Sequence, residues 1–364
     1  MLKRKSLAIL SLVGLAFSSS ALYAGTLLPM ENNNLKVTMP DTHPGFKFSI
    51  AALALKPGAN NLNYVIYNKE LPVQTPTWTE EELKPSNAFA FELGAGYNFA
   101  EGKDVNLDWT HLDTSTSATT VAPNFNYFLG PDYQIGPDGL PIRSSTGHVK
   151  FRYDVINLDV GQFVDFGRHL EMRFLGGIST AFLREQVTST YAGNILAGQY
   201  QGPFSMQQQV TANFTGAGPR IGLNANYILD NGFGFMGEGA FSALIGSSYS
   251  KTNFTGSSQQ LLVLYGQTIN RQFIRDQNVS QVIPGLDAKL GVTYKHSFNK
   301  DTLLTVSAGY QGAVYFNAIS QYLPGTLVSG QSLTTGGIFV ATMNHTLSNY
   351  SVQGPFLKAS LQLS

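Results

Sequence analysis

The sequence predicts an all-β protein, a transmembrane antiparallel up-and-down β-barrel of about ten strands. Three observations support this fold class. Apolar residues recur at every second position in several segments, short turns alternate with long polar stretches, and charged residues make up only 13% of the chain. Ordinary soluble domains carry roughly 25% charged residues. Strands with one face in lipid and the other in water account for this low charge content.

The amino terminus has the features of a secretory signal peptide. Basic residues precede an apolar run at residues 7–17, and small residues follow as far as Ala24. The apolar run is shorter than the roughly 20 residues that a helix needs to cross a bilayer. We expect cleavage after Ala24, with Ala21 as the alternative site. Residues 25–45 are then expected to form a periplasmic segment, and residues 46–364 the barrel.

The clearest strand lies at residues 89–99, where every odd position is apolar and every even position is small or polar. A period of two indicates a strand with two unlike faces. A short turn at residues 101–103 leads into a second alternating run at residues 105–110, which together predict a hairpin. The same unit recurs at residues 156–174, 221–235 and 286–310.

Long polar stretches separate these hairpins, at residues 113–148, 185–212, 248–281 and 319–348. A first strand near residues 46–55 and a last strand near residues 356–363 bring the predicted number to ten. Outer-membrane barrels have short periplasmic turns and long extracellular loops, so we expect both ends of this barrel in the periplasm. Eight to twelve strands remain open, because residues 62–67 and 332–343 would each suit another strand.

Aromatic residues test this topology independently, since a barrel carries aromatic girdles where lipid meets water. Seven aromatic residues fall on the lipid-facing phase beside the short turns, namely Tyr97, Phe99, Tyr227, Phe233, Phe235, Tyr294 and Phe298. A soluble β-sandwich, the alternative fold, also alternates in polarity. It gives no reason for aromatic residues to gather beside one class of turn.

Charged residues occupy the inner phase of the predicted strands in equal numbers of each sign. The acidic residues are Glu92, Asp108, Asp159, Glu171, Glu238 and Asp287, and the basic residues are Lys47, Arg173, Arg220, Lys289, Lys295 and Lys358. In a narrow barrel these charges must pair, because an isolated buried charge is costly. In a wider barrel they would line a water-filled channel and tune its selectivity. Ten strands lie between the filled eight-stranded barrel and the open sixteen-stranded one.

The sequence gives little support for catalysis or for the binding of nucleic acid, a dinucleotide or a metal. The chain has no cysteine, and its formal charge of zero gives no indication of nucleic acid. Residues 232–237 match the GxGxxG spacing, but a strand follows where a dinucleotide site needs a helix. We considered His111 with Asp113, or His148 with Asp132, as an acid–base pair at the outer rim; such residues are common in any surface loop. We expect no enzyme, cofactor or metal.

Several segments resemble the Legionella major outer membrane protein family of pore-forming proteins. These segments are residues 104–112, 153–162, 170–178, 216–223, 232–246, 283–291 and 353–356. The resemblance implies an outer-membrane pore with exposed surface loops, and it supplies no catalytic residues. The absence of cysteine excludes the covalent cross-linking known for some members. The chain also ends in Ser364 rather than in the aromatic residue with which many barrels end.

These observations favour a passive pore in outer-membrane lipid that passes ions and small solutes. The alternative is a plugged structural or adhesive barrel, in which the inner charges pair and the surface loops bind a partner. An outer-membrane enzyme is the third possibility. The sequence leaves assembly into a homo-oligomer open.

Overall fold

The computed structural model describes residues 37–39, 44–68, 78–123, 128–130, 142–197, 200–229, 231–258, 272–275, 278–299, 302–330 and 337–364. Strands make up almost all of these residues, and the described part of the chain contains no helix. None of its elements is therefore a helix able to span a membrane. The expected signal peptide, at residues 1–24, lies outside the described residues.

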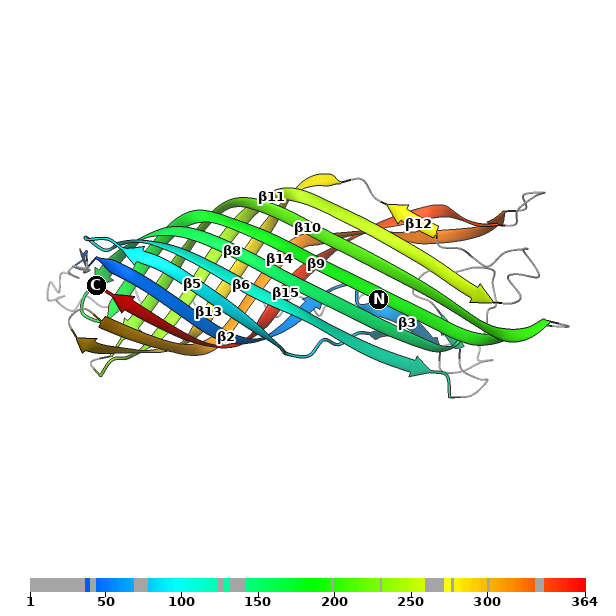
Figure 1. The fold of residues 1–364 in the computed structure, drawn as a ribbon, viewed down its shortest axis with the longest axis horizontal. Coiled ribbons are helices and arrows are strands. Elements are labelled where there is room, and N and C mark those ends of the chain that lie inside the picture. Colours follow the sequence, from blue (N-terminus) through cyan, green and yellow to red (C-terminus); the bar gives the residue numbers. More distant parts are fainter. Residues whose placement is uncertain are drawn as a thin grey trace, which may run out of the picture. The chain divides into compact units, whose positions relative to one another are not determined.

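Ten antiparallel strands form one closed ring (Figure 1). Each pairs with the next along the chain, and β15 pairs with β2 from Leu363↔Phe46 to Tyr350↔Ala59, which closes the ring. This confirms the predicted barrel and its ten strands. The strands are β2 (Gly45–Ala59), β5 (Ala88–Asn98), β6 (Lys103–Val121), β8 (Ile142–Phe166), β9 (Leu170–Ala197), β10 (Tyr200–Ile228), β11 (Phe233–Ser258), β13 (Val279–Asn299), β14 (Thr302–Gly330) and β15 (Gly337–Leu363).

Four short connections lie at one end of the barrel, which we call the turn end. They join β5 to β6, β8 to β9, β10 to β11 and β13 to β14, as the sequence predicts. Glu101, Gly102, Gly167 and Gly232 have positive φ angles there. Three of these residues are glycines, for which the left-handed conformation carries no steric penalty. The first residues of β2 and the last of β15 lie at the same end, where β1 (Val37–Thr38) pairs with the end of β8.

At the opposite end, the far end, the strands continue into the stretches expected to be loops. β6 runs to Val121 and β8 starts at Ile142, while β9 runs to Ala197 and β10 starts at Tyr200. The predicted loop boundaries at 113–148 and 185–212 were therefore wrong. A strand needs about 9 to 11 residues to cross the membrane, and β9 and β10 have 28 and 29. The barrel wall thus extends well beyond the membrane as paired strands.

The outer surface beside the turn end is apolar and exposed. Phe99, Phe233, Phe235 and Phe298 are all at least 46% exposed, and the rings of Phe233 and Tyr294 lie 4.7 Å apart. On β9 the outward apolar residues end at Phe182, and the next outward position is the exposed Arg184. This apolar belt confirms the predicted aromatic girdle and marks where the wall leaves the lipid.

A short segment fills the barrel interior near the far end. It includes β3 (Asn63–Asn68), which pairs with β4 (Trp78–Glu82) and β7 (Phe128–Gly130) rather than entering the ring. The Tyr64 ring lies over Gly147 of β8, and the Tyr191 hydroxyl of β9 donates to the Tyr64 carbonyl oxygen at 2.7 Å. We call residues 61–68 and 78–83 the inner segment. The strand suspected at residues 62–67 therefore exists inside the barrel. The small strand β12 (Gln272–Arg275) pairs with β11.

The exposed belt predicts a strong response to charge. Leu290 is 66% exposed on the outer face of β13. Leu290→Arg is expected to lower the free energy of unfolding in lipid bilayers by roughly 2 to 4 kcal/mol. Leu290→Phe, the matched control, is expected to fold as the wild type does. Equal stability of the two variants in a urea titration would show that this face does not contact lipid.

Candidate functional site: a charged cavity closed by aromatic side chains

The turn-end half of the barrel encloses a cavity of about 480 Å³. All twelve charged residues of the predicted inner phase line it: Lys47, Glu92, Asp108, Asp159, Glu171, Arg173, Arg220, Glu238, Asp287, Lys289, Lys295 and Lys358. The lining also includes Asn98, Ser297 and Ser364, which lie at or just past the turn-end tips of β5, β13 and β15. The cavity therefore reaches the turn end of the barrel.

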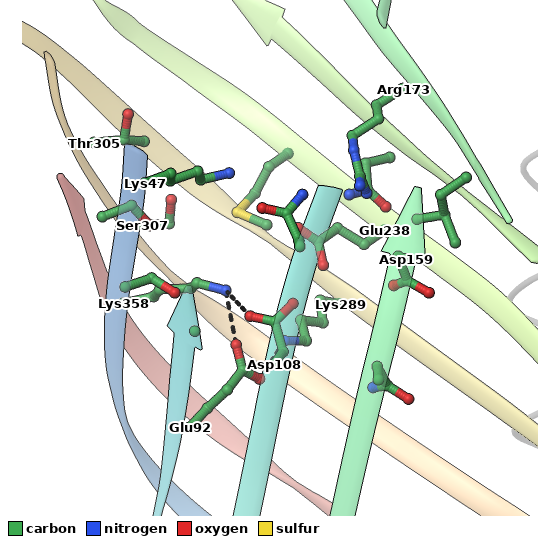
Figure 2. Close-up of a pocket in the computed structure, with 18 of the residues that line it drawn as sticks. Lys47, Glu92, Asp108, Asp159, Arg173, Glu238, Lys289, Thr305, Ser307 and Lys358 are labelled. Carbon is green, nitrogen blue, oxygen red and sulfur yellow. Dashed lines mark hydrogen bonds and ion pairs between the residues drawn. The ribbon is translucent and has the colours of Figure 1, made fainter. Parts of the chain in front are cut away.

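Glu92 on β5 is the centre of one group of charges. Its carboxylate accepts hydrogen bonds from the ammonium groups of Lys289 and Lys358, each at 2.7 Å. Figure 2 shows Lys358 with contacts both to Glu92 and to Asp108, the latter at 3.7 Å. Lys289 lies on β13, which is four strands from β5 in the ring. Its ion pair with Glu92 therefore crosses the interior.

Arg220 on β10 is the centre of a second group. Its Nη2 donates to Asp287 Oδ1 at 3.0 Å, and its Nε donates to Asp159 Oδ2 at 3.4 Å. Asp287 lies on β13 and Asp159 on β8, two strands away in either direction. The Arg220 guanidinium thus links strands on either side of β10. It can do so because it carries several N–H donors that point in different directions. In a third pair, Lys295 donates to Glu171 at 3.1 Å.

The most deeply buried pair contains a residue that the sequence analysis missed. Arg173 Nε on β9 donates to both carboxylate oxygens of Asp104 on β6, at 2.8 and 2.9 Å. Asp104 is fully buried. β8 lies between these strands, and a side chain at Gly161 would collide with both partners. Asp104 could have been found by extending the alternation at Asp108 back through Asn106.

Four aromatic residues gather at the inner side of the cavity, and two of them, Tyr153 and Tyr315, line it. Phe151 and Tyr153 come from β8, Tyr315 from β14 and Tyr350 from β15, and we call them the aromatic layer. The hydroxyls of Tyr153 and Tyr315 lie 3.3 Å apart, although β8 and β14 are five strands apart in either direction around the ring. Tyr153 also stacks on Tyr350, with ring centroids 6.2 Å apart. The layer spans the full width of the barrel.

Beyond the aromatic layer the interior is mostly apolar. Leu55, Leu183, Phe214 and Ile319 are each less than 2% exposed and belong to one buried cluster with residues of the inner segment. Side chains therefore fill this half of the barrel, whereas the turn-end half keeps its cavity.

Glu185 is a fully buried carboxyl within this apolar half. Asn61 of the inner segment and Gln321 of β14 both donate to its Oε1, at 2.7 and 3.0 Å. It lies beyond Phe182, where the apolar belt ends. Burial raises the pKa of this carboxyl to about 7, and the two amide donors oppose that rise.

The histidines considered as acid–base candidates have other partners. His111 Nδ1 lies 2.6 Å from Asp154 Oδ1 on the outer face, whereas Asp113 pairs with Lys150. His148 is hydrogen-bonded to Ser117, and Asp132 lies outside the described residues. Residues 233–258 form β11, so the GxGxxG spacing lies at the start of a strand. Among the described residues, no group of three acidic, histidine or cysteine side chains would hold a metal ion.

Together these features define a membrane-spanning β-barrel with a charged cavity at one end and, among the described residues, a mostly uncharged interior at the other. The chain belongs to the Legionella major outer membrane protein family. The family model, described as the Legionella pneumophila major outer membrane protein precursor, matches residues 38–363. The resemblance seen in the sequence is therefore confirmed, and the protein lies in the bacterial outer membrane. No curated protein matches the chain.

Solved structures with a similar fold include several outer-membrane proteins. The outer membrane protease OmpT from Escherichia coli is 10% identical, with coverage of 91% of this chain and 99% of that chain and a TM-score of 0.38. The monoaromatic hydrocarbon channel CymD is 10% identical over 88% of each chain, with a TM-score of 0.29. A FadL homologue of Pseudomonas aeruginosa is 6% identical over 88% of this chain and 90% of that chain, with a TM-score of 0.23.

The buried pair of Arg173 and Asp104 predicts a large effect on stability. Arg173→Gln leaves a fully buried carboxylate without its cation, so the free energy of unfolding is expected to fall by roughly 3 to 5 kcal/mol. Lys150→Gln breaks the exposed pair with Asp113, and it is expected to change the free energy of unfolding by no more than about 1 kcal/mol. Urea unfolding in detergent micelles measures both. Similar losses would argue against a buried network.

The Glu185 carboxyl predicts a dependence of stability on pH. Because its pKa is higher in the folded chain than in the unfolded chain, its ionisation lowers stability as the pH rises from about 4.5 to about 7. Glu185→Gln removes this loss. The variant is expected to exceed the wild type in free energy of unfolding at pH 8, by an amount on the order of 3 kcal/mol, and by little at pH 4.5. A difference that does not change with pH would contradict the assignment.

Proposed function

We propose that this protein is an outer-membrane pore-forming protein, and that the charged cavity is part of the path for ions and small solutes. The supporting observation is the contrast between the two halves of the interior. Among the described residues, apolar and uncharged polar side chains occupy one half, with Glu185 as its buried carboxyl, whereas twelve charged residues surround about 480 Å³ of space in the other. Replacing buried ion pairs by apolar residues is often neutral or stabilising. Stability alone therefore gives little reason for the charged half.

The aromatic layer and the inner segment obstruct this path. The two tyrosine hydroxyls meet across the barrel and narrow the path at that level. We expect conductance to rise when the aromatic layer opens or the inner segment moves. The inner segment contributes no strand to the ring, so its displacement breaks no pairing between wall strands. The proposal assigns no catalysed reaction to the protein.

A plugged barrel with a structural or adhesive role is the second candidate. The observation that favours it is the same contact between Tyr153 and Tyr315, together with the pairing of most charges in the cavity. In this alternative the far end of the wall would bind a surface partner, and no variant of the aromatic layer would produce a channel.

Conductance in planar bilayers separates the two candidates. The double variant Tyr153→Ala/Tyr315→Ala removes the contact that spans the barrel, so its single-channel conductance is expected to be at least about twofold above that of the wild type, because a wider lumen passes more ions. Tyr310→Ala is the matched control, since Tyr310 lies on β14 but is 53% exposed on the outer face. Its conductance is expected to equal that of the wild type.

A folded double variant that conducts no better than the wild type would contradict the role assigned to the aromatic layer. If neither protein conducts in a bilayer where a known porin does, the pore proposal is overturned and the plugged barrel is favoured. Folding is checked by the resistance of the barrel to detergent at room temperature, compared with the same sample after heating.

A further inference from the structure

The charges of the cavity are not all paired. Lys47 on β2 and Glu238 on β11 have no hydrogen-bond or ion-pair partner among the described residues, although both line the cavity. Glu238 is the direct neighbour of Lys289 across the strand pair, but the Lys289 ammonium donates to Glu92 instead. Their hydrogen-bonding groups therefore remain available to a solute, although Lys47 lies near Asp104 and Asp108, and Glu238 lies near Lys289 and Lys358.

These two side chains come from opposite walls. β2 and β11 are four strands apart in the ring of ten. Figure 2 shows both side chains extending into the cavity, with the Lys47 ammonium and the Glu238 carboxylate as their ends. The neighbours differ in sign along the ring as well. Lysines 289, 295, 358 and 47 lie on the arc from β13 through β15 to β2, with Asp287 as the one acidic lining residue there, while Glu92, Asp108 and Asp159 lie on the arc from β5 to β8.

We propose that the cavity binds small zwitterions, molecules with one carboxylate and one ammonium group, such as a free α-amino acid. Lys47 binds the carboxylate, and Glu238 binds the ammonium group. A simple ion carries a charge of one sign, so it can bind Lys47 or Glu238 but not both. The cavity volume lies within the usual range of about 300 to 1,000 Å³ for small-molecule sites. This inference rests on the proposed function, because it names the solute class of the same path.

The test compares three probes of similar size with different charges. L-Alanine is a zwitterion, N-acetyl-L-alanine is an anion, and L-alaninamide is a cation. Equilibrium dialysis with full-length protein in detergent micelles measures their binding and needs no conduction, because the cavity reaches the turn end. Alanine is expected to bind about tenfold more tightly than either of the others, since each lacks one charged hydrogen bond.

Two variants identify the partner of each group. In Lys47→Gln, alanine is expected to bind about tenfold more weakly and no better than alaninamide. In Glu238→Gln, alanine is expected to bind no better than N-acetylalanine. Lys150→Gln, on the outer face, is the control and is expected to bind alanine as the wild type does. Neither cavity variant removes a member of the ion pairs described above, so both are expected to fold.

The outcomes separate this inference from the pore proposal. Equal binding of the three probes, or no binding of alanine, would overturn the zwitterion site even if the protein conducts. The same affinity for alanine in Lys47→Gln and the wild type would overturn the assigned partner. Discriminating binding by a protein that never conducts would support the site and overturn only the pore.

Discussion

The pairing of β15 with β2 is the interaction on which the rest of this structure depends. Within the hydrocarbon of a bilayer, an unpaired strand edge exposes peptide groups that find no hydrogen-bond partner. The twelve residue pairs between these strands remove that edge, although the strands are separated by almost the whole barrel sequence. Once the ring is closed, the outward positions must face lipid and the inward positions must share one narrow interior.

That narrow interior explains why ion pairs in this protein connect distant parts of the chain. Lys289 meets Glu92, and Arg220 meets Asp287 and Asp159, because the ring brings non-adjacent strands within reach of one another. Each such pair links two sides of the wall through the lumen. The aromatic layer does the same with hydroxyl and ring contacts. The interior therefore supports the wall at several levels.

The sequence predicted the strand faces and the number of strands, because alternation is a local property that closure of the ring preserves. It placed Glu92 and Asp108 on the inner phase and Leu93 and Leu107 on the outer phase, where the structure has them. It could not give the partners. The pairing of Lys289 with Glu92 depends on ring order and on the reach of side chains across the lumen. The contact between Tyr153 and Tyr315 could not be predicted for the same reason.

The lengths of the strands were misjudged for a different physical reason. Beyond the membrane the outward face of a strand can be polar, so residues 204–216 of β10 and residues 247–257 of β11 are rich in polar residues, as loops are. In β10 the alternation persists, since Phe204, Met206, Val210 and Phe214 face the interior. In residues 247–257 of β11 it is lost, whereas backbone pairing continues. The inner segment was likewise ambiguous, since a short apolar strand suits the wall and the interior equally well. The amino-acid composition of a segment indicates whether lipid or water surrounds it more reliably than it indicates whether the segment is a strand.

The unbroken pairing of β9 with β10 has a consequence for how this sequence can evolve. Their 28 residue pairs run from Tyr227↔Leu170 to Tyr200↔Ala197 without a shift. One inserted residue in either strand would turn every later side chain to the opposite face. β14 and β15 already contain a shift between Tyr315 and Ile319, where Asn317 has a positive φ angle. Changes of length among descendants of this gene should therefore be tolerated at that irregularity and at the strand tips, while β9 and β10 change by substitution alone.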